Sequence, residues 1–329
     1  MDAKPLITKT LITGVSKPVS QIALGTAFYS IDSKEKWFEL LDEYVNFGGA
    51  ILDTARGYGV SENVLGLWME ARSTRHQIII QTKCGLTGAD GYLPAQNFPE
   101  VVREEITTSL QALRTDYTDV LLPHRDNQEM PVAGILAPLN NELANGRIHA
   151  FGASNWEYRR LTEANKYADK HGMKSFAVVS NNISLALPTA SFYKGLVSTD
   201  KVDERWHQET GIPLIPWSSQ AGGFYTGQYT PQMRDDFTLD SSELDGFTSR
   251  MLKVYGTDEN FERLTRAKQL GEEKGGYTAV EIALAWLLHK PFPLVPVVGP
   301  RTQEELASCV QATSLSLTEQ EIKWLNLEA

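Results

Sequence analysis

The sequence of 329 residues predicts an α/β fold, a (β/α)8 TIM barrel of parallel strands. Three observations support this prediction: apolar runs of strand length recur along the chain, amphipathic stretches of helical period separate most of them, and the connections are short. A buried parallel strand reads as a continuous apolar run, because helices cover both faces of the sheet. The eight runs, enough for a closed barrel, are residues 21–24, 50–53, 77–83, 118–123, 148–152, 176–180, 212–217 and 294–298.

The elements follow one another in a regular order. The opening segment, residues 6–19, alternates around Gly14 like a β-hairpin, and we expect it to close the bottom of the barrel. The first helix, residues 33–47, carries its apolar side chains on one side and ends at the stop signal Gly48-Gly49. Further helices are predicted at 61–72, 99–114, 131–145, 156–171, 259–274, 278–288 and 318–327.

No linker or low-complexity tract divides the chain, so residues 1–329 are predicted to form a single barrel domain. One stretch breaks the alternation: a glycine-rich segment runs from Trp217 to about Phe247 without a strand or helix pattern. A long irregular loop inside a compact domain is usually functional. This loop leaves the seventh strand, where barrel enzymes often bind phosphate.

Composition excludes several classes of protein. The net charge of −10 disfavours binding to nucleic acid or to an anionic membrane, because both need a basic surface. No apolar run approaches a membrane span, and the first residues lack the apolar core of a signal peptide. Cys84 and Cys309 fit a reduced cytoplasmic protein; Cys84 follows Lys83, but a packing role is favoured over a redox role. Monomer and homo-oligomer both stay open.

Four polar residues follow apolar runs directly or within a few positions: Asp53, Tyr58, Lys83 and His124. Polar side chains gathered where several parallel strands end are typical of the catalytic face of a barrel enzyme. Aspartate, tyrosine, lysine and histidine together can deliver one proton to a carbonyl oxygen. Singly, each has an ordinary structural explanation, such as a turn aspartate or a core histidine. Their joint placement favours a catalytic site.

Other nucleotide and metal motifs are absent from the sequence. It contains no G-x-G-x-x-G, no phosphate-binding loop ending in Gly-Lys and no histidine pair spaced for zinc, so no metal site is predicted. His124-Arg-Asp126 resembles a kinase catalytic loop, but Pro131 stands where the asparagine is required. The chemistry is therefore assigned to the four strand-end residues.

At these residues the chain resembles the aldo-keto reductases. Residues 53–59, Asp-Thr-Ala-Arg-Gly-Tyr-Gly, match the aspartate-to-tyrosine signature of that family, and Lys83 and His124 follow in the expected order. The resemblance extends from about residue 22 to residue 312. Three later segments also match: Phe-Gly-Ala-Ser-Asn at 151–155, Ile-Pro-Trp-Ser-Ser at 215–219, and Val-Val-Gly-Pro-Arg-Thr-Gln-Glu-Glu-Leu at 297–306.

The resemblance implies NADPH-dependent reduction of a small-molecule aldehyde or ketone. Tyr58 would be the general acid, and Lys83 would bring the phenol pKa from about 10 toward a useful range. Asp53 would pair with Lys83, and His124 would orient the carbonyl. The implied cofactor-binding residues are Gly25, Thr26, Ser154, Asn155, Ser180, Asn181, Trp217, Ser218, Gly223, Gly299, Arg301 and Glu305.

Two departures from the family pattern affect the cofactor. Ser180 stands where members carry a glutamine that contacts the nicotinamide carboxamide, with Asn181 or Asn182 as substitutes. In the adenosine loop, Ser308-Cys309 replaces the usual Glu-Asn pair, so we expect different adenine contacts. Arg301 can pair with the 2′-phosphate of NADPH, whereas the neighbouring Glu304 and Glu305 oppose an anion there. NADPH is the predicted cofactor, and NADH stays possible.

The substrate is read from residues beyond the strand ends. Aromatic walls with several hydrogen-bonding groups suit a polyhydroxylated carbonyl such as a sugar. Because the chain ends soon after its last helix, we expect no long C-terminal lid and a broad substrate range. The candidate substrate contacts are Phe28, Tyr29, Arg125 and Trp156, with Arg56 and the loops 85–97 and 222–247 as further walls.

Two alternative functions stay open. One is a cofactor-binding sensor or regulatory subunit of low turnover, which the altered region around Ser180 favours and the intact set of four residues disfavours. The other is a sugar isomerase or epimerase on the same fold, which product analysis without added cofactor would reveal.

Overall fold

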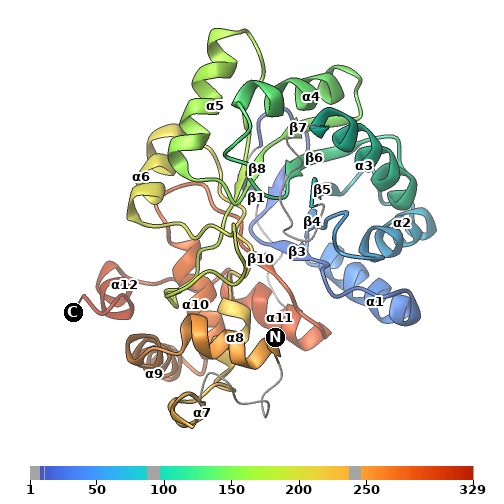
Figure 1. The fold of residues 1–329 in the computed structure, drawn as a ribbon. Coiled ribbons are helices and arrows are strands. Elements are labelled where there is room, and N and C mark those ends of the chain that lie inside the picture. The colour runs from blue at the N-terminus through green and yellow to red at the C-terminus, as the bar shows by residue number, and fades with distance from the viewer. Residues whose placement is uncertain (1–7, 11, 87–96, 237–245, 329) are drawn as a thin grey trace.

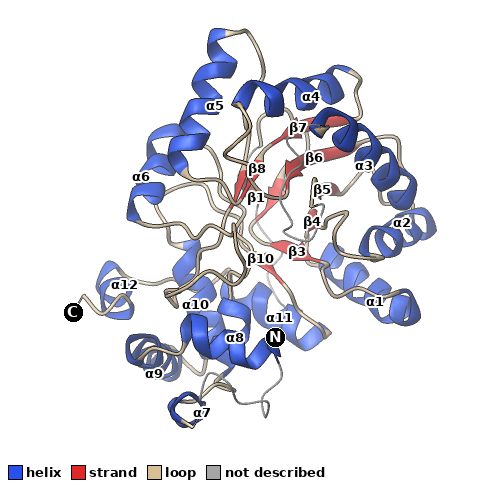
Figure 2. Ribbon diagram, in the orientation of Figure 1, coloured by secondary structure: helices blue, strands red, loops and turns tan. Residues whose placement is uncertain are grey.

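Parallel strands form the centre of the molecule and helices surround them (Figure 1; Figure 2). The computed structural model describes residues 8–10, 12–86, 97–236 and 246–328. Six parallel strands pair in the order β10-β3-β4-β5-β6-β7. Their bounds are β3 Ala23–Gly25, β4 Ile51–Asp53, β5 Ile79–Cys84, β6 Thr118–Pro123, β7 Ile148–Phe151 and β10 Val297–Val298.

The ring of strands is closed by shorter pairings. β8 (Ala153–Ser154) continues β7 beyond Gly152 and pairs with β9 (Val179–Ser180). Leu214 then bridges Val179 to Leu294, which leads into β10. The predicted strand 212–217 therefore occupies its place in the barrel but pairs through a single bridge residue. Proline at positions 213 and 216 explains this, because proline has no N–H to donate to a ladder.

Each strand position contributes at least one apolar residue to a buried cluster inside the barrel. Packing of this kind makes the barrel interior a core and not a pore. The eight predicted strand positions are confirmed by this cluster. It contains Ala23, Ile51, Ile79, Val120, Ala150, Val178, Ile215 and Val295.

The N-terminal hairpin covers the bottom of the barrel, as predicted. β1 (Thr8–Thr10) pairs antiparallel with β2 (Val19–Ser20), and Gly14 turns between them with a φ of 93°. The ammonium of Lys17 lies 2.8 Å from Asp119 Oδ1, near the start of β6. Ile12, Val15 and Val19 join the interior cluster from below.

The eight predicted helices are present with end shifts of a few residues. Three further helices of ten residues, α6, α8 and α11, lie where no helix was predicted. The loop 217–247 contains the 3₁₀ helix η2 (Ala221–Thr226) and the short α7, and its residues 237–245 lie outside the described part of the chain. No helix in the described ranges is long and apolar enough to cross a membrane. The helices are α1 Lys34–Asn46, α2 Ser61–Arg72, α3 Phe98–Leu113, α4 Val132–Ala144, α5 Tyr158–Lys170, α6 Lys201–Thr210, α7 Pro231–Asp235, α8 Gly246–Tyr255, α9 Asp258–Glu273, α10 Ala279–Leu288, α11 Gln303–Ala312 and α12 Glu319–Leu325.

Candidate active site

The four predicted catalytic residues meet where β4, β5 and β6 end. Asp53 is the last residue of β4, and Lys83 lies one residue before the end of β5. Tyr58 belongs to the loop that follows β4, and His124 comes directly after β6. The parallel register brings these strand ends side by side, with Asp53 opposite Gln81 and Lys83 opposite Leu122.

Lys83 is fully buried and bonded on several sides. Its Nζ lies 2.7 Å and 2.8 Å from the two carboxylate oxygens of Asp53 and donates to the Thr54 carbonyl at 2.9 Å. Gln81 Nε2 donates to the same carboxylate at 2.7 Å. Burial lowers the pKa of Lys83, but the Asp53 carboxylate and the Tyr58 hydroxyl outweigh it and raise the pKa overall. Lys83 therefore stays a cation inside the barrel.

Tyr58 is half-buried, and its hydroxyl oxygen lies 3.5 Å from Lys83 Nζ. Burial raises the pKa of Tyr58, while the charge of Lys83 opposes that rise and the charge of Asp53 adds to it. Lys83 acts in the expected direction, yet the expected net lowering of the phenol pKa is not found, because burial is the larger effect. At neutral pH the phenol is thus protonated and can serve as a proton donor.

His124 stands edge-on to Tyr58, with ring centroids 5.7 Å apart and an interplanar angle of 80°. Burial, together with the charges of Lys83 and Arg125, lowers the pKa of His124 to about 3. The imidazole is therefore neutral at physiological pH, with one ring nitrogen as a donor. Its Nδ1 is buried and bonds to no partner within the described residues.

Asn155 connects the strand-end cluster to a second group of predicted residues. Its Nδ2 donates to the His124 carbonyl at 3.0 Å and to Ser154 Oγ at 3.1 Å. Its Oδ1 accepts from Trp217 Nε1 and from the backbone of Val197, both at 3.2 Å. The structure thus brings Ser154, Asn155 and Trp217 together beside the strand-end cluster.

The region that replaces the family glutamine offers one unused hydroxyl. Asn181 bonds to the backbone of Trp156 through both its Oδ1 (3.1 Å) and its Nδ2 (2.7 Å). Asn182 donates to the Trp217 carbonyl at 3.1 Å and accepts from Ser198. Ser180 Oγ is buried without a hydrogen-bond partner in the described ranges. Of the three candidates, Ser180 alone retains a side-chain polar atom that is not yet bonded.

The other predicted cofactor residues lie on several segments around the barrel. Thr26 is buried, and its hydroxyl bonds with Ser61 Oγ at 2.6 Å. The guanidinium of the exposed Arg301 lies over the ring of Phe28, 4.8 Å from its centroid, and the backbone N–H of Arg301 donates to Glu305 Oε2 at 2.6 Å. The half-buried Gly25 ends β3, Ser218 and Gly223 lie in or beside η2 with positive φ, and Gly299 is exposed directly after β10.

A depression of about 200 Å³ lies beside Arg301, between α1 and the start of α11. Two cations, Lys36 and Arg301, and two anions, Glu39 and Glu304, share its wall. The chemistry of this wall admits a small anionic group, since a guanidinium binds phosphate oxygens in pairs. The complete lining is Lys36, Glu39, Leu40, Arg301, Thr302, Gln303 and Glu304.

The predicted substrate contacts differ in exposure. Phe28 is 61% exposed, whereas Tyr29 is buried and stacks on Trp37 with ring centroids 4.5 Å apart. Trp156 is completely buried and packs against Phe176 in the core, so its side chain is not an open wall. The Arg125 guanidinium donates to the Lys194 carbonyl at 2.9 Å. Of the predicted loops, residues 87–96 and 237–245 lie outside the described part of the chain.

The segment 191–198 borders the site and was not predicted. Phe192 packs edge-on against Trp217, with ring centroids 6.2 Å apart, and against Tyr255 at 5.3 Å. Val197 reaches Asn155 through its backbone. No sequence signal separates this segment from an ordinary loop, because it contributes one aromatic ring and otherwise backbone contacts.

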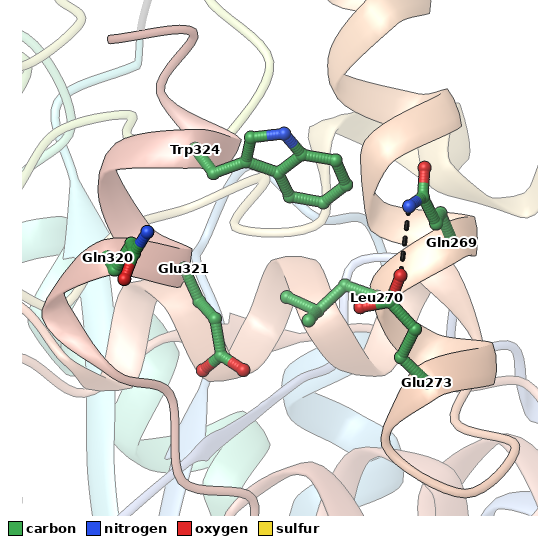
Figure 3. Close-up of a pocket in the computed structure, with 6 residues that line it drawn as sticks. All are labelled: Gln269, Leu270, Glu273, Gln320, Glu321 and Trp324. Carbon is green, nitrogen blue, oxygen red and sulfur yellow. Dashed lines mark hydrogen bonds between the residues drawn. The ribbon is translucent and has the colours of Figure 1, made fainter. Parts of the chain in front are cut away.

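A second depression of about 300 Å³ lies between α9 and α12, and none of the strand-end residues lines it (Figure 3). In this depression Gln269 donates to Glu273 at 2.9 Å, and the ring of Trp324 forms part of the wall. Within the described ranges, no group of three or more His, Cys, Asp or Glu residues is placed to hold a metal ion. Cys84 and Cys309 are both free and buried. The lining is Gln269, Leu270, Glu273, Gln320, Glu321 and Trp324.

A closed parallel barrel with a buried lysine–carboxylate pair and a tyrosine at the ends of its strands has the architecture of a barrel enzyme. The sequence profile of the Aldo/keto reductase family matches residues 21–326. The chain therefore belongs to the Aldo/keto reductase family, as its sequence motifs predicted.

Named relatives of the chain are oxidoreductases. Norsolorinic acid reductase stcV of Emericella nidulans is 30% identical over 92% of this chain and 76% of its own length. Norsolorinic acid reductase B of Aspergillus parasiticus is 28% identical over 97% of this chain and 83% of its own length. Aryl-alcohol dehydrogenase (NADP(+)) of Phanerodontia chrysosporium is 27% identical over 89% of this chain and 76% of its own length.

Proposed function

We propose that the protein is an NADP(H)-dependent carbonyl reductase that converts an aldehyde or ketone to an alcohol. One observation carries this proposal: the carboxylate of Asp53 holds the ammonium of Lys83 at 2.7 Å, and that ammonium lies 3.5 Å from the Tyr58 hydroxyl. Asp53 thus fixes the positive charge of Lys83 next to the proton donor Tyr58. Such an arrangement serves proton transfer to an oxygen that gains negative charge.

The roles of the residues follow from their ionisation. Tyr58 is protonated at neutral pH and gives its proton to the substrate carbonyl oxygen. Lys83 stabilises the phenolate that remains, because its charge lies 3.5 Å from the phenol oxygen. His124 is neutral, so it can donate a hydrogen bond that orients the carbonyl without bringing a second positive charge. A nicotinamide cofactor, when bound, supplies the hydride.

The residues beside the strand-end cluster fit a nicotinamide. The buried hydroxyl of Ser180 lacks a partner among the residues that the structure describes, and an amide group would satisfy it. Ser154 and Asn155 lie next to it, and the half-buried ring of Trp217 offers a stacking face. We assign the carboxamide contact to Ser180 and not to Asn181, whose amide already bonds to Trp156.

NADPH is the proposed cofactor, with NADH as the alternative. Support comes from the depression beside Arg301, where Lys36 adds a second positive charge. Glu304 belongs to the same wall, so the preference depends on the guanidinium and ammonium outweighing it. One relative of the chain carries NADP(+) in its name.

An aromatic carbonyl is the proposed substrate class. Two polar side chains just past His124 are engaged within the protein and do not favour a sugar: Arg125 bonds to the Lys194 carbonyl, and Asp126 is buried beside Arg160. The ring of Phe192 packs beside Trp217 and adds apolar surface near the site. Relatives named for aryl alcohols and for norsolorinic acid agree with this preference.

Replacing Tyr58 with phenylalanine tests the function. NADPH consumption with an activated aromatic aldehyde is followed for wild type and Tyr58→Phe, after fluorescence titration has shown that both bind NADPH. We expect kcat to fall by about 10²–10⁴-fold in the variant with cofactor affinity retained, because the proton donor is lost.

Three other results would contradict the proposal. Equal turnover in both proteins would remove Tyr58 from the mechanism. Tight NADPH binding without turnover on any carbonyl would favour a sensor or regulatory subunit. Conversion of a sugar to its isomer without added cofactor would favour an isomerase.

A further inference from the structure

The loop that carries Tyr58 has no regular secondary structure, yet its position sets the distance from Tyr58 to Lys83. Its backbone is anchored at a few points: the Arg56 N–H donates to the Lys83 carbonyl at 3.0 Å, and the Tyr58 N–H donates to the Ala55 carbonyl at 3.0 Å. The N–H of Ser61 donates to the Tyr58 carbonyl at 3.2 Å. Only the first of these bonds reaches a strand of the barrel; the other two join residues of the loop itself or of the start of α2.

Glu62, in the first turn of α2, is a completely buried carboxylate that the proposed mechanism does not use. Its Oε1 accepts a hydrogen bond from Thr82 Oγ1 at 2.6 Å, and its Oε2 lies 2.5 Å from Arg56 Nη1. Thr82 directly precedes Lys83 in β5, and Arg56 lies two residues before Tyr58. One carboxylate thus links the strand that carries the ammonium to the loop that carries the phenol.

Other groups restrict the same arginine. Arg56 Nη2 donates to the Gly59 carbonyl at 3.3 Å, so the guanidinium spans the loop on both sides of Tyr58. Glu105, on α3, also interacts electrostatically with Arg56 and accepts the Gly85 N–H at 2.7 Å. Arg56 therefore lies among two carboxylates and a loop carbonyl, and only its link to Glu62 is a direct ion pair within the described residues.

We propose that Glu62 is a positioning residue, which through Arg56 and Thr82 holds Tyr58 at proton-transfer distance from Lys83. This inference rests on the proposed reductase function. A carboxylate suits the task because it accepts from a hydroxyl and a guanidinium at once, and such charge-assisted bonds are short and directional. Complete burial of the Glu62 carboxylate makes the link rigid, since this carboxylate cannot exchange its partners for water.

The conservative variant Glu62→Gln tests the inference, because it keeps the shape and loses the charge that holds Arg56. We expect kcat to fall roughly ten- to a hundredfold, as misplacement of a reacting group does, with KM and the NADPH dissociation constant little changed. In the reverse direction, oxidation of an aromatic alcohol requires the Tyr58 phenolate, so activity rises with pH through the Tyr58 pKa. Retreat of Tyr58 from Lys83 raises that pKa, so the rise in activity moves to higher pH.

A matched control lies at the other end of the barrel. Glu142, near the end of α4, pairs with Arg147 at 2.5 Å, and its side chain is 6% exposed against 0% for Glu62; both arginines are 25% exposed. Glu142→Gln removes an equivalent buried pair just before β7. We expect both variants to lower the melting temperature, and Glu142→Gln to leave kcat and the pH profile as in wild type.

The outcomes separate the inference from the function on which it rests. Wild-type kcat and pH profile in Glu62→Gln would overturn the positioning role, and so would equal losses of kcat in Glu62→Gln and Glu142→Gln. If Glu62→Gln does not fold, Thr82→Val removes one link only and is judged by the same kcat and pH criteria. If the wild-type protein binds NADPH but turns over no carbonyl substrate, both the proposed function and the inference are overturned.

Discussion

Lys83 and His124 both lie near Tyr58, and their pKa values are shifted in opposite directions by their surroundings. Burial lowers the pKa of each side chain. Lys83 has the Asp53 carboxylate at 2.7 Å and keeps its charge. His124 is buried without such a carboxylate among the described residues, and the charges of Lys83 and Arg125 add to the effect of burial, so its pKa falls to about 3. The Tyr58 phenol therefore has one cation, Lys83, and one neutral hydrogen-bond donor, His124, beside it.

The Asp53 carboxylate is therefore expected to decide the charge of Lys83. In Asp53→Asn the burial effect is no longer opposed by an ion pair, so the pKa of Lys83 falls below its unfolded value of about 10.4. The buried ammonium of Lys83 then gives up its proton at a lower pH than in wild type. We expect a large loss of kcat and a loss of about 3 kcal/mol in the free energy of unfolding at neutral pH, because one partner of a buried pair is removed.

The pH dependence of unfolding checks the sign of this effect. In wild type the folded pKa of Lys83 is raised, so its contribution is complete below about 10.4 and is lost only as pH rises through the folded pKa. In Asp53→Asn the unfolded state binds more protons, so stability rises with pH from neutral toward about 10. Calorimetric melting temperatures between these limits measure the difference. If the melting temperature of Asp53→Asn changes with pH in the same way as that of wild type, Asp53 does not set the pKa of Lys83.

At the scale of elements, apolar runs predicted the strands well because each strand contributes to a buried barrel. Among the undetected helices, α6 and α11 show why they were missed and what could have revealed them. The polar α6 buries Asp203, Trp206 and His207 among exposed neighbours, so no apolar period marks it. The signals that could have revealed them are the caps, Asp200 with Gly211 for α6 and Thr302 with Glu305 for α11.

Side-chain direction was harder to predict than element position. Trp156 follows the site residue Asn155, so sequence order suggested that it lines the pocket. Asn155 has a φ of 60°, and this left-handed residue turns the chain so that Trp156 enters the core. The four strand-end residues escaped this difficulty, because the ends of parallel strands meet at one face whatever the loops do.

Gly152, between β7 and β8, tests how tightly the barrel is closed. A Cβ at this position would lie 2.2 Å from the Val178 carbonyl oxygen, which belongs to the neighbouring strand. We expect Gly152→Ala to cost about 2–3 kcal/mol, because overpacking displaces backbone that pairs across the seam. Urea midpoints measure the loss.

The same substitution in a helix provides the comparison. Gly134, in α4, would place its Cβ no closer than 3.7 Å to another side chain. Gly134→Ala should stabilise the protein by about 0.5–1 kcal/mol, because alanine lowers the entropy cost of the helix. Similar losses of unfolding free energy in Gly152→Ala and Gly134→Ala would contradict the prediction that close packing at Gly152 makes its substitution costly.

At the scale of the whole molecule, buried charge is divided between two ends of the barrel. At the top, Asp53 holds Lys83 beside Tyr58. At the bottom, Asp119 is equally buried and lies 2.8 Å from Lys17 of the hairpin and 2.9 Å from Arg75. Its Oδ2 also accepts the Ile80 N–H at 2.9 Å. Asp119, Lys17 and Arg75 thus link the hairpin and β5 to β6 at the end of the barrel opposite the site.

This division predicts that stability and catalysis can be separated by the end that is changed. Asp119→Asn should lower the free energy of unfolding by about 3 kcal/mol, because Lys17 and Arg75 lose their shared anion in a buried place. Its kcat, measured well below its melting temperature, should equal that of wild type, whereas Asp53→Asn loses both kcat and stability. A fall of kcat in Asp119→Asn as large as that in Asp53→Asn would mean that the hairpin end also shapes the site, and that the two ends of the barrel are coupled through β5 and β6.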